Sequence, residues 1–199
     1  GREALQGLSQ ADSVVMDPHK GLFLPYGTGA VLVRDVDQLA RAHSYQADYM
    51  QDARSEGQQY SPADLSIELS RPFRGLGLWL PLKLFGLAAF RAALSEKIWL
   101  ARYFHERLKG IKGFETGSYP DLSVVTFRYV PESGDADAFN RKLVRAVHRD
   151  GKVFISSTML DGRFTLRAAI LHLRTHRQEV DYLIEFLART ALELESAGT

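Results

Sequence analysis

The stretch Ser13-Val14-Val15-Met16-Asp17-Pro18-His19-Lys20-Gly21 organises the interpretation of the whole chain. Its apolar run predicts a buried strand, because a short apolar run bounded by turn residues is typical of a strand inside a sheet. The strand runs into Pro18, and His19 and Lys20 follow at its carboxyl end, where the loops of an α/β sheet open into a crevice. A lysine that is partly desolvated there has a lowered pKa and can attack a carbonyl carbon.

A second motif, Tyr26-Gly27-Thr28-Gly29, follows closely and precedes another apolar run at residues 29–34. Such a turn exposes backbone N–H groups and a hydroxyl, and these groups suit a phosphate. A Schiff-base lysine beside a phosphate-binding turn predicts pyridoxal phosphate (PLP), the commonest carbonyl cofactor of such lysines. Taken singly, each motif has a plainer interpretation, because a His-Lys pair is usually surface decoration and a Gly-Thr-Gly turn is usually only a tight turn.

Residues 11–20, Ala-Asp-Ser-Val-Val-Met-Asp-Pro-His-Lys, resemble the PLP-lysine signature of the group II amino-acid decarboxylases, the family of the aromatic-L-amino-acid decarboxylases. Further blocks of similarity follow in the family's order and at about its spacing, so the resemblance spans nearly all 199 residues. These blocks are residues 25–35, residues 69–76 with Trp79, and residues 162–167. The resemblance implies an α/β fold of the fold-type I PLP-dependent transferase kind.

The resemblance also implies a domain organisation. Residues 1–94 are expected to be the carboxyl-terminal part of the PLP-binding large domain, with a mobile loop at about residues 44–62. Residues 95–199 are expected to form a small α+β carboxyl-terminal domain. In the family, the acid that pairs with the pyridine nitrogen and the ring that stacks on the cofactor lie farther upstream than the nineteen residues before Lys20. We therefore expect the amino-terminal part of the large domain to be missing from this chain.

The resemblance assigns roles to the residues of both motifs. Lys20 is expected to form the internal aldimine with PLP, and His19 to lie beside the phosphate or that linkage, although a neutral histidine bonded to the backbone is the plainer alternative. Asp17 stands where many members have an asparagine that touches the phosphate. A carboxylate repels a phosphate dianion, so Asp17 is expected to turn away or to bind a neighbouring cation. The remaining contacts to the phosphate, or to a neighbouring subunit, are expected from Gly27, Thr28 and Gly29.

The implied reaction is α-decarboxylation of an L-amino acid to an amine and CO2. In the family, a loop tyrosine helps to protonate the substrate carbon, and Tyr60 is the best candidate here, although it could equally pack the loop against the body. If Tyr60 is not the proton donor, an aldehyde synthase on the same scaffold becomes the alternative. A further alternative is a non-catalytic folded fragment or dimerisation module. Gly21, where many members carry tryptophan, weakens any inference that the substrate is aromatic.

Composition restricts the other function classes. The formal net charge of +1 gives no electrostatic reason to expect nucleic acid or an anionic membrane as partner. The absence of cysteine fits a reducing, cytoplasmic compartment. The six histidines fall in no compact ligand spacing, so no metal is expected. Fold-type I sites lie at dimer interfaces, so the resemblance implies a homodimer.

Periodicity predicts the remaining elements. An apolar helix at residues 75–90, too short to span a bilayer, is expected to be enclosed, with Pro81 kinking it or marking its first turn. A second helix is expected at about residues 91–109. Shorter helices are expected after an Asp35 cap and between an Asp135 or Asp137 cap and Gly151. The other expected elements are strands at 114–116, 122–130, 153–157 and 163–170, and a last helix that begins with a Thr175–Gln178 capping box.

Overall fold

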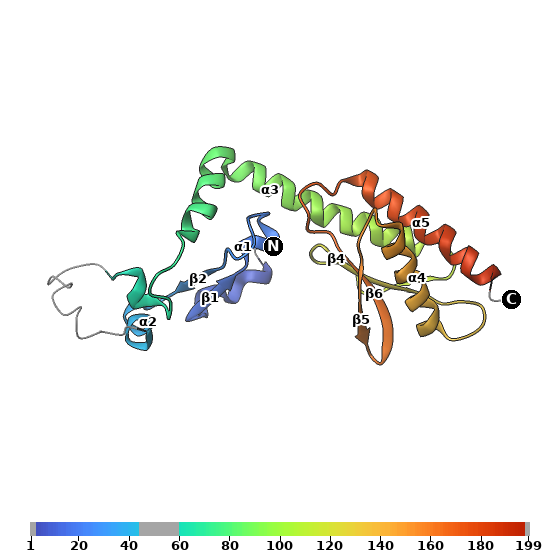
Figure 1. Cartoon of the computed structure of the whole chain (residues 1–199), viewed down its shortest axis with the longest axis horizontal. Coiled ribbons are helices and arrows are strands. Elements are labelled where there is room, and N and C mark those ends of the chain that lie inside the picture. The colour runs from blue at the N-terminus through green and yellow to red at the C-terminus, as the bar shows by residue number, and fades with distance from the viewer. Residues whose placement is uncertain (1–2, 44–59, 198–199) are drawn as a thin grey trace. The chain divides into compact units, whose positions relative to one another are not determined.

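The computed structural model describes residues 3–43 and 60–197, and the chain divides into two compact units, Gly1–Leu84 and Phe85–Thr199. Unit 1 contains the 3₁₀ helix η1 (Glu3–Gln10), β1 (Ser13–Met16), α1 (Pro18–Gly21), β2 (Ala30–Val33), α2 (Val36–His43), the 3₁₀ helix η3 (Pro62–Leu65) and the start of α3 (Arg74–Lys109). Unit 2 contains the rest of α3, then β3 (Phe114–Thr116), β4 (Val124–Tyr129), α4 (Ala136–Asp150), β5 (Ser156–Leu160), β6 (Arg163–Ala169) and α5 (Arg177–Ser196) (Figure 1). The domain boundary expected at residues 94 and 95 stays a prediction.

The two strands of unit 1 form an antiparallel pair, in which Ser13 lies opposite Val33 and Met16 opposite Ala30. The sequence predicted both strands, but their expected burial is wrong for the described residues. Val15 is 74% exposed and Leu32 is 59% exposed. A two-stranded ladder has too little area to bury its own apolar side chains. The strands are therefore formed locally, but their apolar faces are not covered within the described part of unit 1.

Helix α3 consists of two helical segments, as the sequence predicted, but they meet at Gly86 and not between residues 90 and 91. It is continuous from Arg74 to Lys109 except at Gly86, where φ 72° and ψ 162° interrupt the helical path. Only glycine adopts such a conformation without strain, so the break falls at Gly86 rather than at Pro81. The expected enclosure is also wrong within this chain, because Leu84 and Phe85 are each 68% exposed. By length and composition alone, α3 could cross a membrane.

Unit 2 contains a four-stranded antiparallel sheet in the order β3-β4-β6-β5. Alternate residues of β4 face the core: Val125, Phe127 and Tyr129 are buried, and the residues between them are half-buried. Helices contribute to the same core, since the Phe104 ring of α3 packs edge-on against Phe127 and the Phe139 ring of α4 stacks on Tyr129. The strand–helix–strand–strand–helix layout expected for this region is confirmed, with its helices on one face of the sheet (Figure 1).

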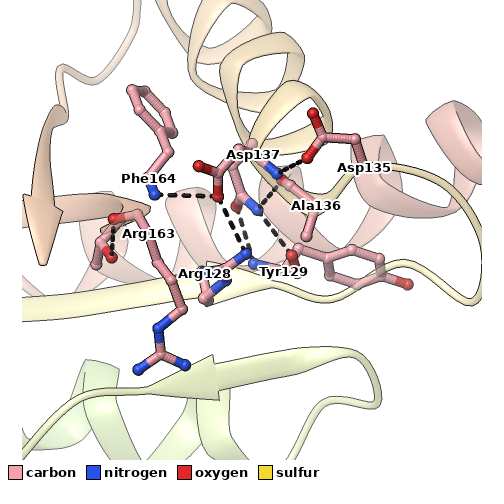
Figure 2. A network of polar contacts seen from close by, with 9 residues as sticks. Arg128, Tyr129, Asp135, Ala136, Asp137, Arg163 and Phe164 are labelled. Atoms are coloured by element: carbon pink, nitrogen blue, oxygen red, sulfur yellow. Dashed lines mark hydrogen bonds and ion pairs between the residues drawn. The ribbon is translucent and has the colours of Figure 1, made fainter. Parts of the chain in front are cut away.

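The amino-terminal turn of α4 is tied to the sheet by side chains that take the place of strand partners (Figure 2). Asn140 is fully buried, accepts a hydrogen bond from the Tyr129 N–H at 2.9 Å, and donates to the Tyr129 carbonyl at 2.7 Å. Asp137 accepts from the Phe164 N–H at 3.0 Å. Asp135 is the N-cap and accepts from the Asp137 N–H, which decides between the two expected caps.

Two expectations for the end of the chain are wrong in detail. β5 covers residues 156–160 rather than 153–157, because its register follows from the turn at Asp161 and Gly162, both of which have positive φ. An Asp-Gly pair with positive φ at both residues is the preferred two-residue hairpin turn. The start of α5 is also shifted by one residue, because Glu179 accepts from the His176 N–H at 2.7 Å and replaces the expected Thr175–Gln178 pair.

Candidate active site

Lys20 lies on α1, a single helical turn that directly follows β1. Pro18 occupies the first turn, where its fixed φ and missing N–H cost nothing. Asp17 precedes it at the N-cap position, but its side chain makes no capping hydrogen bond. Instead, its Oδ2 accepts from the Lys20 Nζ at 2.6 Å. The local sequence therefore places a carboxylate and an amine side by side at the carboxyl end of the strand.

The Tyr26-Gly27-Thr28-Gly29 motif forms the turn that leads into β2. The Thr28 N–H donates to the Pro25 carbonyl at 3.3 Å, and Gly27 has a φ of 86°. Positive φ at the third residue of a four-residue turn is the reason that glycine is preferred there. Apart from the adjoining residues of the turn, no atom of residues 3–43 and 60–197 lies within 4 Å of the Cβ that a side chain would add at Gly27 or Gly29. The turn therefore leaves open space beside its backbone.

The two motifs come together through His19 and Thr28. The Thr28 carbonyl accepts hydrogen bonds from the His19 backbone N–H at 3.3 Å and from its Nδ1 at 2.9 Å. Since a carbonyl only accepts, the hydrogen of a neutral His19 ring is on Nδ1 and its Nε2 remains an acceptor. This is the plainer alternative for His19, a histidine bonded to backbone, and it leaves Nε2 for a ligand.

Two contacts around this turn were given no role from the sequence. The Tyr26 ring lies edge-on against the His19 ring, with their centroids 5.2 Å apart. Thr28 is buried, and its Oγ1 lies 3.7 Å from the position of a Cβ on Gly77 in α3. The sequence feature that could have indicated the first contact is the aromatic Tyr26 directly before Gly27 of the turn. The second contact carried no local signal, because Gly77 is distant in sequence.

The electrostatics of the site are dominated by the Asp17–Lys20 pair. The Lys20 hydrogen bond is the largest cause that holds the pKa of Asp17 below its usual value, and the charge of His19 acts in the same direction. The side chain of Lys20 is 61% exposed, so the residues described here do not supply the desolvation expected of a nucleophilic lysine. The expectation that Asp17 binds a neighbouring cation is met by the Lys20 ammonium.

The Tyr60 hydroxyl donates to the Asp37 Oδ1 of α2 at 2.6 Å. Its part in catalysis stays a prediction, and most of the expected mobile loop, residues 44–59, lies outside the described residues. Arg74 forms a two-point pair with Glu68 at 2.6 and 3.1 Å, and Arg71 donates to the Ser66 hydroxyl at 3.0 Å. Both arginines therefore make local polar contacts near the surface, with partners five and six residues away in the sequence.

The residues present fit the aldehyde end of a PLP molecule better than its phosphate end. The Lys20 amine is accessible to an aldehyde carbon, and the open space at Gly27 and Gly29 lets a phosphate approach backbone amides. The Asp17 carboxylate lies on the same short turn and repels an anion. The arrangement can therefore present an amine to a phosphate-bearing aldehyde, with Asp17 as the one discordant group.

The fold of nearly the whole chain is similar to that of solved structures. The crystal structure of rice (Oryza sativa) TDC with PLP and tryptamine matches with a TM-score of 0.89 and 27% identity, over 98% of this chain and 41% of that one. The match defines the class as the mixed α/β fold of the PLP-dependent decarboxylases. The long helix α3 lies within the matched part, so it has a counterpart in a crystallised enzyme of this fold.

The pyridoxal-dependent decarboxylase conserved domain matches residues 1–130. The aromatic-L-amino-acid decarboxylase of Bacillus atrophaeus is 37% identical over 186 residues, which is 90% of this chain and 38% of that protein. The phenylacetaldehyde synthase of Arabidopsis thaliana is 32% identical over 173 residues, 85% of this chain and 35% of that protein. This chain belongs to the group II PLP-dependent decarboxylase family, which confirms the resemblance read from the sequence. It spans about two fifths of the length of these relatives.

Proposed function

We propose that this chain carries the reactive lysine of a PLP-dependent decarboxylase that converts an L-amino acid to an amine and CO2. Because the chain spans about two fifths of its relatives' length, the proposal concerns the complete enzyme, including an amino-terminal part of the large domain. The observation that carries it is the pair of hydrogen bonds from His19 to the Thr28 carbonyl. Those bonds bring the lysine motif and the glycine turn together, as a lysine-bound phosphate cofactor requires.

The residues of this chain would divide the work as follows. Lys20 would hold the cofactor by its amine and release it to the substrate amine, after which the freed amine can move a proton. His19 would offer Nε2, and the turn Gly27-Thr28-Gly29 would offer backbone amides and a hydroxyl to the phosphate. When bound, PLP supplies an electron-accepting ring that stabilises the electron pair left when CO2 departs. The protein's part is to orient the carboxylate and exclude water.

Tyr60 would return a proton to the substrate carbon. The Tyr60 hydroxyl donates to the Asp37 carboxylate at 2.6 Å, and this hydrogen bond would have to break during the reaction. If Tyr60 stays on Asp37, the carbon lacks this donor, and oxidative deamination becomes the second candidate function. In that reaction CO2 leaves, dissolved O2 is reduced to hydrogen peroxide, and water releases the nitrogen as ammonia and leaves an aldehyde. The similarity to the Arabidopsis phenylacetaldehyde synthase favours keeping this candidate.

The family suggests the remaining properties. We propose a fold-type I enzyme that acts as a homodimer in the cytoplasm, with its large domain ending near residue 94. The apolar side chains that β1, β2 and α3 leave exposed in this chain support the idea that further protein covers unit 1. An isolated, inactive fragment or dimerisation module remains the third possibility for these residues alone.

The proposal is tested by incubating the complete enzyme with PLP and each of the common L-amino acids, aromatic and non-aromatic, and measuring CO2, amine, aldehyde and hydrogen peroxide. Decarboxylation is expected to release CO2 and amine in equal amounts with no peroxide, and Lys20→Ala is expected to abolish turnover and cofactor-dependent visible absorbance. Lys112→Ala, which removes an exposed amine in unit 2, is the matched control and should retain both. Aldehyde and peroxide in place of amine would select the second candidate, and no product from any substrate would contradict both.

A further inference from the structure

Asp17 has an unusual position for an N-cap residue, because its side chain does not serve the helix. The α1 turn brings it to Lys20 twice: the Lys20 backbone N–H donates to the Asp17 carbonyl at 2.9 Å, and the Lys20 Nζ donates to the Asp17 Oδ2 at 2.6 Å. The backbone bond fixes the spacing at which the side chains meet. The single turn of α1 therefore places the carboxylate of Asp17 next to the amine of Lys20, three residues away.

The chemistry of an amine makes this contact matter. An amine attacks an aldehyde or anhydride carbon through its nitrogen lone pair, and an ammonium has none to offer. A carboxylate in hydrogen-bond contact favours the ammonium. The same carboxylate repels a phosphate dianion that approaches the neighbouring turn. The charged groups that act on Asp17 among the described residues are Lys20 and His19, both on α1, and neither removes its negative charge above pH 5.

We propose that Asp17 is a positioning residue that holds the Lys20 amine in a hydrogen-bonded ion pair and so restrains its reaction with a phosphate-bearing aldehyde. This inference rests on the proposed function only in taking Lys20 as the reactive amine and PLP as the aldehyde. It predicts that Lys20 in the Asp17→Asn variant reacts faster at neutral pH than Lys20 in the unchanged chain.

The first test needs no cofactor. Trace acetic anhydride transfers an acetyl group to a free amine nitrogen, with acetate leaving and the nitrogen losing a proton, so the rate follows the unprotonated fraction. Peptide mass spectrometry measures this rate at each lysine between pH 6 and pH 11. Because the pair is exposed, Asp17→Asn is expected to raise the Lys20 rate by about two- to five-fold at pH 7.5 and by less at high salt. Asp17→Glu, which retains a carboxylate, is expected to restore the slow rate in part.

The second test separates the amine from the phosphate. PLP and pyridoxal, which lacks the phosphate, each condense with a free amine to a carbon–nitrogen double bond with loss of water. Borohydride adds hydride to that carbon, the nitrogen takes a proton, and the product is a stable secondary amine. Asp17→Asn is expected to increase labelling of Lys20 by both aldehydes, with the larger increase for PLP, because only PLP is repelled by the carboxylate.

Controls of matched chemistry come from the same chain. Lys112 and Glu132 form an exposed pair at 2.7 Å in unit 2, so Glu132→Gln should change the labelling of Lys112 and leave Lys20 as it was. Circular dichroism checks that both Asp17 variants keep the helical content of the unchanged chain. A rate difference that follows Glu132→Gln at Lys20 would mean a general charge effect and would overturn the proposal.

The outcomes separate this inference from the proposed function. Equal acetylation of Lys20 in the unchanged chain and Asp17→Asn from pH 6 to pH 9 overturns the inference, whatever PLP does. A difference confined to PLP also overturns it, because the carboxylate would then act on the phosphate and not on the amine. Faster acetylation in Asp17→Asn, without any PLP adduct at Lys20 in the complete enzyme, supports the inference and contradicts the proposed function.

Discussion

The two units of this chain differ in how much of their own structure they can stabilise. Among the described apolar residues, unit 1 buries only Pro18, Leu24 and Ala40, whereas every other buried apolar side chain belongs to unit 2. Burial of apolar area is the dominant favourable term in folding. Unit 2 therefore has the core of an independent domain, and unit 1, which carries Lys20, has the geometry of a site without a core to hold it. The lesson is that the reactive motif and the source of stability lie in different parts of the chain.

The largest expected effect comes from the core of unit 2. Phe127 is 1% exposed and contacts the rings of Phe104 and Phe114, so Phe127→Ala removes both contacts and leaves a cavity. We expect a loss of about 3–5 kcal/mol in the free energy of unfolding of unit 2. The measurement is urea unfolding followed by the fluorescence of Trp99 in a Trp79→Phe background, so that only unit 2 reports.

Val15→Ala is the comparison in unit 1, where the side chain is 74% exposed. Surface substitutions of this kind usually change stability by less than about 0.5 kcal/mol. Unfolding of unit 1 is followed by the fluorescence of Trp79 in a Trp99→Phe background. A loss at Val15 as large as that at Phe127 would mean that unit 1 buries this face in the folded chain, and the contrast between the units would then be wrong.

The second effect concerns the buried polar tie between α4 and β4. Both the oxygen and the nitrogen of the Asn140 side-chain amide form hydrogen bonds to backbone groups, including one from Nδ2 to the Ala136 carbonyl at 2.7 Å. The residue is 0% exposed. Asn140→Ala leaves the Tyr129 N–H and C=O without these partners in a buried place, and each such group costs about 1–3 kcal/mol. We expect a loss of about 2–4 kcal/mol in the same assay. Gln38→Ala on exposed α2 is the control, followed by the fluorescence of Trp79 in a Trp99→Phe background because it lies in unit 1; a loss there of similar size would contradict the difference between the units.

The sequence predicted elements whose signals are local. Asp35 caps α2 by accepting from the Asp37 N–H at 2.9 Å, and Gly151 ends α4 in the left-handed conformation, both as expected. Caps are readable because the residue that satisfies the helix end lies within a few positions of it. For the same reason, the Asp-Pro-His-Lys motif could be assigned to the end of a strand.

The failures share a different origin. Exposure of α3 and β1 could not be predicted, because apolar periodicity states which side chains need burial and not which part of the protein provides it. The expected bounds of β5 were wrong because they followed the apolar run around Ile155, whereas the hairpin turn at Asp161 and Gly162 sets the register of the strand. In the site, the His19–Thr28 bond joins residues nine apart across a loop, and no periodicity encodes such a contact.

The third effect is a loss of stability at alkaline pH, which we expect from the buried Tyr129 of unit 2 and not from the exposed Tyr26 of unit 1. The pKa of Tyr129 is raised from 10.0 to about 12, mainly by burial of the phenol and secondly by a hydrogen bond with Glu195. A raised pKa means that the unfolded chain loses this proton first, so the stability is present below pH 10 and is lost as the pH rises from about 10 to 12. We expect unit 2 to lose on the order of 1–3 kcal/mol over this range.

Tyr129→Phe removes the phenol, so it should flatten that alkaline loss. Tyr26 in unit 1 is 94% exposed, and Tyr26→Phe should leave the alkaline slope unchanged. Unfolding midpoints measured at several pH values, with tyrosinate absorbance as a second signal, check both variants. An unchanged alkaline slope in Tyr129→Phe would rule out this tyrosine as its source.

The smallest effect lies at the acidic end and concerns Glu96, which joins α3 to the start of α5. Its Oε1 bonds to the His176 Nδ1 at 2.7 Å, its Oε2 accepts from the buried Lys97 Nζ at 2.8 Å, and these two bonds hold the pKa of Glu96 below its usual value. A lowered carboxyl pKa gives stability that is present above about pH 4.5 and is lost as the pH falls through the folded-state value. Because Glu96 is 36% exposed, solvent screening limits the contribution to less than about 1 kcal/mol. Glu96→Gln should therefore lower the stability of unit 2 slightly at pH 7 and reduce the slope of its stability against pH between about pH 5 and pH 3. Glu68→Gln, at the exposed pair of unit 1, should leave the Trp99 transition unchanged. Equal slopes in Glu96→Gln and the unchanged chain would show that the acid sensitivity of unit 2 comes from other carboxylates.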